Sequence, residues 1–170
     1  MNTLQEQLRA ISYRFGKPTE KIRIIIDECN LQHAALSILG RRIDYQRLRE
    51  KILAGCREAA SPPKIITDET PHIEAFIFAM QNRGFEVEVI KSQKSNGKHK
   101  NRTDPYIHRA LYEAGDSDTD VVALVSGDGD FEPALRYLKE IKGKRVEVFA
   151  LREALATSLW AVADRVEFLD

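Results

Sequence analysis

Residues 120–131 read Asp-Val-Val-Ala-Leu-Val-Ser-Gly-Asp-Gly-Asp-Phe. The run from Val121 to Val125 is continuously aliphatic and mostly β-branched, which is typical of a strand buried on both faces of a parallel sheet. A short polar turn ends this run, and apolar residues then recur at helical spacing, at Phe131, Leu135, Leu138 and Ile141. The segment therefore predicts a strand at the centre of a sheet, a tight turn and a helix.

The turn after this strand carries two acids, Asp128 and Asp130. In an open α/β sheet, ligands bind in the crevice beyond the carboxyl ends of the strands, so both acids are placed where a ligand would lie. Gly127 and Gly129 flank Asp128 and allow both a tight turn and close approach of a ligand. A purely structural interpretation stays open, in which Asp130 or Ser126 caps the following helix.

The rest of the chain alternates predicted strands with predicted helices. Strands are predicted at 22–26, 64–67, 85–89, 145–150 and 166–168, and the helices between them have apolar stripes over 31–38, 43–53, 73–81, 107–114 and 155–162. This alternation predicts a three-layer α/β/α sandwich with a mostly parallel central sheet, a PIN-like and Rossmann-like class of fold. The strand at 85–89 alternates apolar residues with Glu86 and Glu88, so we expect it near an edge of the sheet.

The first eighteen residues are predicted to form an amphipathic helix that precedes the main domain, 19–170. Its stripe is formed by Leu4, Leu8, Ile11 and Phe15, and the helix is expected to end near Gly16. Two arrangements stay open. The stripe packs onto the sheet, which we favour, or it contacts a second copy of the chain or another protein partner.

Composition places the chain in a broad class. Its 170 residues suit one domain, and 26 Lys plus Arg balance 26 Asp plus Glu, so overall charge does not select a partner. Cys29 and Cys56 are far apart and form neither a disulfide framework nor a zinc-binding pattern. Glu6 and Arg9 lie where a signal peptide would be apolar, and no apolar run is long enough for a membrane span. We expect a reduced, cytoplasmic protein without a membrane partner.

Two further acids occupy positions like those of Asp128 and Asp130. Asp27 ends the strand at 22–26, and Asp104 opens the helix that leads into the central strand. Asp104 precedes Pro105, so it also suits the N-cap of that helix, and this interpretation stays open. If the four acids converge, their repulsion is relieved by protons or by a cation. An all-oxygen ligand set favours Mg²⁺ or Mn²⁺.

Basic residues provide candidate contacts for a polyanion. The linker 91–102 carries Lys94, Lys98, Lys100 and Arg102 without an acid, and Arg41 lies with Arg42 in another loop. Such cations can hold a phosphate backbone without reading its sequence, although a merely solvated loop is the alternative. An acidic metal site beside basic loops suits hydrolysis of a phosphodiester. The chain has no Walker lysine motif, no GxGxxG and no GxSxG.

Five segments together resemble a known family. They are Ile-Ile-Ile-Asp-Glu-Cys-Asn-Leu at 24–31, Lys-Asn-Arg-Thr-Asp at 100–104, Leu-Val-Ser-Gly-Asp-Gly-Asp-Phe-Glu-Pro at 124–133, Gly-Lys-Arg-Val-Glu-Val-Phe-Ala at 143–150 and Ser-Leu-Trp-Ala-Val-Ala-Asp at 158–164. In this order they resemble the NYN domains of the PIN-like nuclease superfamily, in their LabA-like branch. The most specific of these segments is Ser-Gly-Asp-Gly-Asp-Phe at 126–131.

The resemblance implies a metal-dependent ribonuclease that acts on RNA, which we expect to be single-stranded. It implies that Mg²⁺ or Mn²⁺ is bound by four acids, with Asn30 and Ser126 supporting the ligands or a substrate phosphate. The four acids are Asp27, Asp104, Asp128 and Asp130. Glu28 departs from the small residue that such domains usually carry at this position, and Pro105 and His108 depart from the usual continuation after the middle acid.

Two other functions stay open at this stage. One is a non-catalytic module of the same fold that binds RNA or a protein. The other is a metal-dependent phosphatase of small phosphoesters, which is disfavoured because the haloacid dehalogenase pattern places its paired acids after the first strand.

Overall fold

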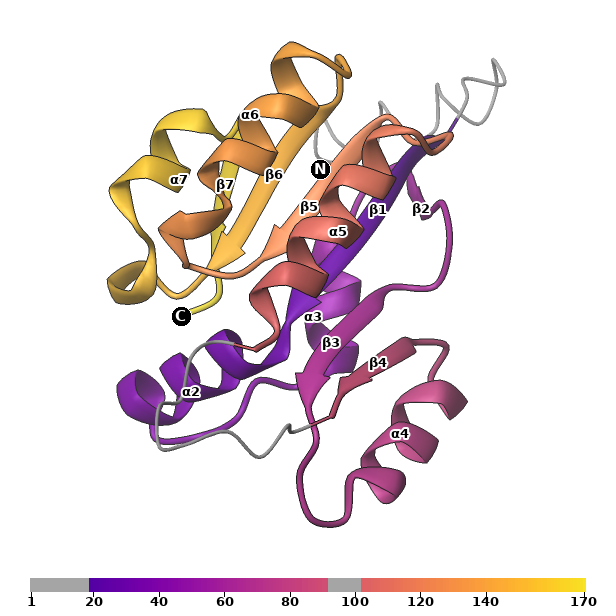
Figure 1. The fold of residues 1–170 in the computed structure, drawn as a ribbon, viewed down its shortest axis with the longest axis vertical. Coiled ribbons are helices and arrows are strands. Elements are labelled where there is room, and N and C mark those ends of the chain that lie inside the picture. Colours follow the sequence, from indigo (N-terminus) through magenta and orange to yellow (C-terminus); the bar gives the residue numbers. More distant parts are fainter. Residues whose placement is uncertain (1–18, 92–101) are drawn as a thin grey trace, which may run out of the picture.

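The computed structural model describes residues 19–91 and 102–170. Within these ranges seven strands form one sheet, in the order β4-β3-β1-β5-β6-β7, with the short β2 also paired to β1 (Figure 1). Every strand pair is parallel. The strands are β1 (Glu20–Asp27), β2 (Arg57–Ala59), β3 (Lys64–Asp68), β4 (Glu86–Ile90), β5 (Val121–Val125), β6 (Arg145–Ala150) and β7 (Arg165–Phe168).

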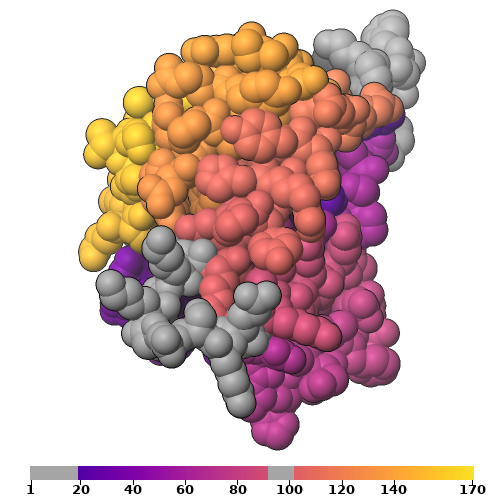
Figure 2. Space-filling model, in the orientation of Figure 1, coloured from indigo at the N-terminus to yellow at the C-terminus, as the bar shows by residue number. Residues whose placement is uncertain are grey.

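Helices cover both faces of the sheet. One face carries α2 (Glu28–Leu39), α3 (Tyr45–Ile52) and α4 (Ile73–Asn82), and the other carries α5 (Asp104–Gly115), α6 (Glu132–Glu140) and α7 (Thr157–Val162). Two short 3₁₀ helices, η1 (Gly129–Phe131) and η2 (Arg152–Ala154), follow β5 and β6. The residues from α5 onward form most of the face seen in Figure 2. The predicted three-layer sandwich is confirmed.

The central strand β5 is buried along its whole length. Val122 and Leu124 pack toward α5 and α6, whereas Val121, Ala123 and Val125 pack toward α2 and α3. A strand with a helix layer on each face has no solvated side, which is why its sequence does not alternate. Full burial of each such valine or leucine contributes about 1.5–3 kcal/mol relative to exposure.

The pairing of β1 with β5 fixes the position of the residues that follow both strands. Ile22 pairs with Val121, and the register continues to Ile26 and Val125. Asp27 and the residue after Val125 therefore emerge side by side at the carboxyl edge of the sheet. This edge is where an open parallel sheet binds its ligands.

The remaining differences from the sequence prediction are local. The edge position of β4 is confirmed, and its Glu88 makes a 2.7 Å ion pair with Lys64. β2 was not predicted, because three residues without an aliphatic run carry no strand signal. The predicted helix over 43–53 is shorter, since Asp44 caps α3 and leaves Ile43 outside it. The predicted helix at 1–18 lies outside the described residues.

Among the helices of 19–91 and 102–170, none combines the length and the apolar character needed to cross a bilayer.

Candidate metal centre

The turn after β5 is held by hydrogen bonds to side chains of its own and of α2. The Gly127 amide donates to Asn30 Oδ1 at 3.0 Å, and the Asp128 amide donates to Ser126 Oγ at 3.2 Å. The Asp130 amide donates to Asp128 Oδ1 at 3.0 Å, so Asp128 caps η1. The alternative in which Asp130 or Ser126 caps the following helix is therefore wrong, and Asp128 combines a capping role with its place in the acidic group.

Two glycines of this turn lie against the segment that follows β6. A Cβ added to Gly127 would lie 2.1 Å from the Ala154 carbonyl oxygen, and one added to Gly129 would lie 2.9 Å from Ser158 Oγ. The Ala156 amide also donates to the Gly127 carbonyl at 3.0 Å. The turn needs glycine at 127 because another backbone occupies the space of a side chain.

Asp104 is brought to the site by the start of α5. Thr103 takes the N-cap position and Asp104 is the first helical residue, so the prediction of Asp104 as the cap is wrong by one position. Pro105 follows within the first turn, where its missing N–H is not needed. One turn further on, the His108 ring packs 5.0 Å from the ring of Phe131, which accounts for the position of that histidine.

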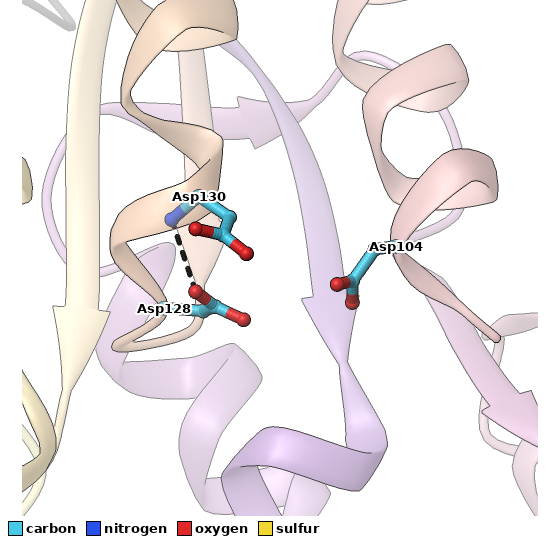
Figure 3. Close-up of side chains that lie close together, drawn as sticks. All are labelled: Asp104, Asp128 and Asp130. Atoms are coloured by element: carbon cyan, nitrogen blue, oxygen red, sulfur yellow. Dashed lines mark hydrogen bonds between the residues drawn. The ribbon is translucent and has the colours of Figure 1, made fainter. Parts of the chain in front are cut away.

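Asp104, Asp128 and Asp130 form one acidic group. Each has a carboxylate oxygen within 4.8 Å of an oxygen of the other two. Figure 3 shows Asp104 extending from α5 toward Asp128 and Asp130, which come from the turn on the other side. Three carboxylates at this spacing repel one another unless a cation or protons compensate them. The donors are all hard oxygen atoms, and this set fits Mg²⁺ or Mn²⁺.

Asp27 lies beside this group but outside it. Its side chain is only 3% exposed, and it accepts hydrogen bonds from Ser126 Oγ at 2.9 Å and from the Asn30 amide at 3.2 Å. Burial raises the pKa of Asp27 to about 7; the two hydrogen bonds oppose this rise, and the nearby charges of Asp104 and Asp128 add to it. Asp27 therefore caps α2 and joins β1 to β5 behind the acidic group.

A pocket of about 510 Å³ opens at this edge of the sheet. It is lined by Asp27, Cys29, Asn30, His33, Thr103, Asp104 and Asp128. Cys29 was not predicted as part of the site. Its Sγ lies 3.7 Å from Oδ2 of Asp68, another acid that ends a strand, and burial raises the pKa of the Cys29 thiol to about 11. The only sequence signal for Asp68 was that it follows Thr67 at the end of a predicted strand.

A larger pocket lies elsewhere and does not contain these acids. Its volume is about 600 Å³, and it is lined by residues such as Lys21, Arg23, Glu86 and Asp118, near the amino ends of the strands. Acids and bases alternate around it and pair with each other, as Lys21 does with Asp118 at 2.7 Å. Size alone therefore does not identify the candidate site, whereas the close approach of three carboxylates at the other edge does.

The predicted basic contacts are distributed differently. Arg41 borders a separate pocket of about 210 Å³ with Arg42, Arg47 and Lys51, beyond the far end of α2. Arg102 immediately precedes the α5 cap and is partly buried beside the acidic site. The predicted phosphate contacts Lys94, Lys98 and Lys100 fall outside the described residues. The structure thus brings together the acids, Asn30 and Ser126, but not Arg41.

Parallel strands between two helix layers, with acids from separate segments collected beyond the carboxyl ends, define a PIN-like α/β domain. The family model of the NYN domain matches residues 21–170. The chain belongs to this family, which is one of PIN-like nuclease domains. The resemblance to NYN domains is thereby confirmed, while membership of the LabA-like branch stays a prediction.

The fold is also similar to that of a solved structure. It is the crystal structure of a protein of unknown function from Vibrio parahaemolyticus, with a TM-score of 0.80 and 26% sequence identity. The alignment covers 89% of this chain and 94% of the other. Comparison with curated proteins gives no match.

Proposed function

We propose that the protein is a metal-dependent ribonuclease that hydrolyses phosphodiester bonds of single-stranded RNA. The observation that carries this proposal is the acidic group itself. Asp104, Asp128 and Asp130 place oxygen atoms within 4.8 Å of one another on the scaffold of a nuclease family. Three neighbouring carboxylates repel one another, and a divalent cation bound among them would relieve that repulsion.

The same three residues would hold Mg²⁺ or Mn²⁺, with Asp27 behind them. When bound, such an ion supplies a Lewis acid that stabilises charge on a phosphate and increases the acidity of water. The chain itself supplies positioning. Ser126 and Asn30 hold Asp27 and the turn that carries Asp128, so the fold itself positions these two acids.

Cations of the chain would hold the substrate backbone. Arg102 lies next to the start of α5, and the predicted basic linker that contains Lys94, Lys98 and Lys100 leads directly into it. Contacts of this kind position RNA without selecting its sequence. Arg41 lies beyond the far end of α2, in a pocket separate from the acids, and we propose that it contacts a more distant phosphate of the RNA.

The decisive experiment compares the protein with two variants on labelled single-stranded RNA. The native protein with Mn²⁺ or Mg²⁺ should cut the RNA, whereas EDTA or Asp128→Asn should abolish cleavage. Asp118→Asn is the matched control, because the Asp118 carboxylate is exposed at the opposite edge of the sheet and pairs with Lys21. Absence of metal-dependent cleavage in the native protein, or equal cleavage by Asp128→Asn, would contradict the proposal.

A non-catalytic RNA-binding module is the second candidate. One observation favours it: Asp27 uses both carboxylate oxygens in hydrogen bonds and stands outside the close group, which leaves three acids together. The same experiment separates the two functions. Retention of RNA in a gel-shift assay, with metal present and no cleavage, would support the binding module.

A further inference from the structure

Near the C-terminus, the ring of Phe168 contacts two other side chains, those of Arg152 and Trp160. The rings of Trp160 on α7 and Phe168 on β7 lie 5.4 Å apart between centroids, inclined by 40°. The guanidinium carbon of Arg152 lies 3.9 Å from the centroid of the Phe168 ring. Trp160 remains 53% exposed. We call Arg152, Phe168 and Trp160 the aromatic platform.

The platform lies at the same edge of the sheet as the acids. Phe168 is the last residue of β7 and pairs with Ala150, the last residue of β6. β7 is two strands from β5, which corresponds to about 10 Å at the usual spacing of strands. In Figure 1 the chain ends beside the carboxyl ends of β5 and β6. A ligand at the acids could therefore extend over the platform.

One continuous segment joins the platform to the acidic turn. It starts at Arg152 and runs through η2 into α7, and on its way it packs against the two glycines that flank Asp128. The Ala156 amide bonds the Gly127 carbonyl, and the Ser158 hydroxyl lies against Gly129. The segment that begins at Arg152 and carries Trp160 is thus in direct contact with the acidic turn.

The chemistry of the platform matches an unpaired nucleobase. Single-stranded nucleic acids are held by stacking of bases on aromatic rings and on arginine planes, beside cations that follow the backbone. Arg152 supplies both the planar cation and the positive charge, and Trp160 presents an exposed indole.

We propose that the aromatic platform binds a base of single-stranded RNA, a short distance along the strand from the bond at the acids. The inference rests on the proposed function, because it names a subsite of the same substrate. It also predicts that the protein prefers unpaired RNA, since bases within a duplex are not free to stack on a side chain.

Trp160 is the only tryptophan of the chain, so its fluorescence reports on the platform directly. The protein carrying Asp128→Asn, which should not cut, is titrated with a single-stranded ten-nucleotide oligoadenylate and with an abasic oligomer of equal length. We expect saturable quenching by the oligoadenylate and little change with the abasic strand. Because substitution of Trp160 removes this signal, the Trp160 variants are compared with the parent by the fluorescence anisotropy of a labelled oligoadenylate. Trp160→Ala should bind the oligoadenylate about tenfold more weakly, while Trp160→Phe should stay close to the parent.

Phe78→Ala is the matched control, because Phe78 is an aromatic residue of α4 that is 69% exposed on the other half of the sheet. It should leave binding unchanged. In the cutting protein, Trp160→Ala should raise KM and leave kcat nearly constant, as expected of a residue that binds away from the reacting bond.

Three results would contradict the proposal that the platform binds a base. They are tryptophan emission that does not change when RNA binds, quenching by the abasic strand equal to that by the oligoadenylate, or an affinity for the oligoadenylate that Trp160→Ala leaves unchanged. A change in emission with protein concentration, without RNA, would assign the surface to contact between copies. Failure of the nuclease proposal is distinguishable: quenching and a Trp160 effect without cleavage would retain the platform, whereas cleavage without them would retain the nuclease alone.

Discussion

The hydroxyl of Ser126 donates a hydrogen bond to Oδ2 of Asp27 at 2.9 Å, across 99 residues of sequence. The two residues follow the neighbouring strands β5 and β1, and both are almost completely buried. The bond therefore joins the two halves of the sheet at the place where the candidate site begins. It also fixes the turn, because the same oxygen of Ser126 accepts from the Asp128 amide.

Replacing Ser126 by alanine should weaken the fold and the site together. The variant leaves an oxygen of Asp27 and the Asp128 amide without this partner, and such losses cost about 1–3 kcal/mol of unfolding free energy. Urea denaturation measures the change. Ser37→Ala is the control, because Ser37 is exposed on α2, and its effect should stay within about 0.5 kcal/mol. Equal stability of the two variants would show that the bond contributes little.

The raised pKa of Asp27 predicts an unusual pH dependence of stability without metal. The folded protein holds the proton up to about pH 7, while the unfolded chain loses it near its ordinary value of 3.8. Between these pH values the folded state binds more protons, so the free energy of unfolding should fall as pH rises. The contribution is complete below about pH 4 and is lost through pH 7.

Denaturation in EDTA at a series of pH values, compared with Asp27→Asn, tests this dependence. The asparagine does not titrate, so the variant should lose this part of the decline. Parallel curves for the two proteins between pH 4 and pH 7 would mean that Asp27 is already ionised when folded.

Alanine at Gly127 should disturb the turn more than alanine at Gly129. At 127 the new Cβ would meet the Ala154 backbone at 2.1 Å, so the whole segment after β6 must move. At 129 the nearest atom, Ser158 Oγ at 2.9 Å, belongs to a side chain that can rotate. We expect a loss of about 1–3 kcal/mol or more for Gly127→Ala and a smaller one for Gly129→Ala. Thermal unfolding of both variants measures the order, and the reverse order would contradict it.

The basic linker predicts a salt-dependent affinity for RNA. Joint replacement of Lys94, Lys98 and Lys100 by alanine should weaken binding of single-stranded RNA and lower the slope of log affinity against log salt by about 2. Fluorescence anisotropy at several salt concentrations gives the slope. Joint replacement of Lys139, Lys142 and Lys144, on α6 and after it, is the control for net charge. If the slope of log affinity against log salt stayed unchanged, these lysines would not contact the RNA backbone.

Much of the architecture could be predicted from the sequence because its strands are chemically distinct. The uninterrupted run at Val121–Val125 indicated a central strand, and the alternation around Glu86 and Glu88 indicated an edge strand, and both were found. β2 was missed, since its pairing to β1 depends on tertiary contact and not on its own three residues. The cap of α5 was misplaced by one residue, because Thr103 and Asp104 both have suitable side chains.

The candidate site was predictable in its members but not in its division of roles. Strand ends pointed to Asp27, Asp128 and Asp130, and the structure brings all of them to one edge. Pattern alone gives no side-chain direction, so it could not separate Asp27, which is buried between β1 and β5, from the acids that face one another. The approach of Ala154 to Gly127 was equally invisible, because it joins segments that only the folded sheet brings together.

The three acids of the close group lie within residues 104–130, whereas Asp27, which lies behind them, follows β1. During synthesis on the ribosome β1 emerges long before β5, so Asp27 has no Ser126 hydroxyl to accept from when it first appears. The buried support behind the acids can therefore form only after β5 has also been made and has paired with β1.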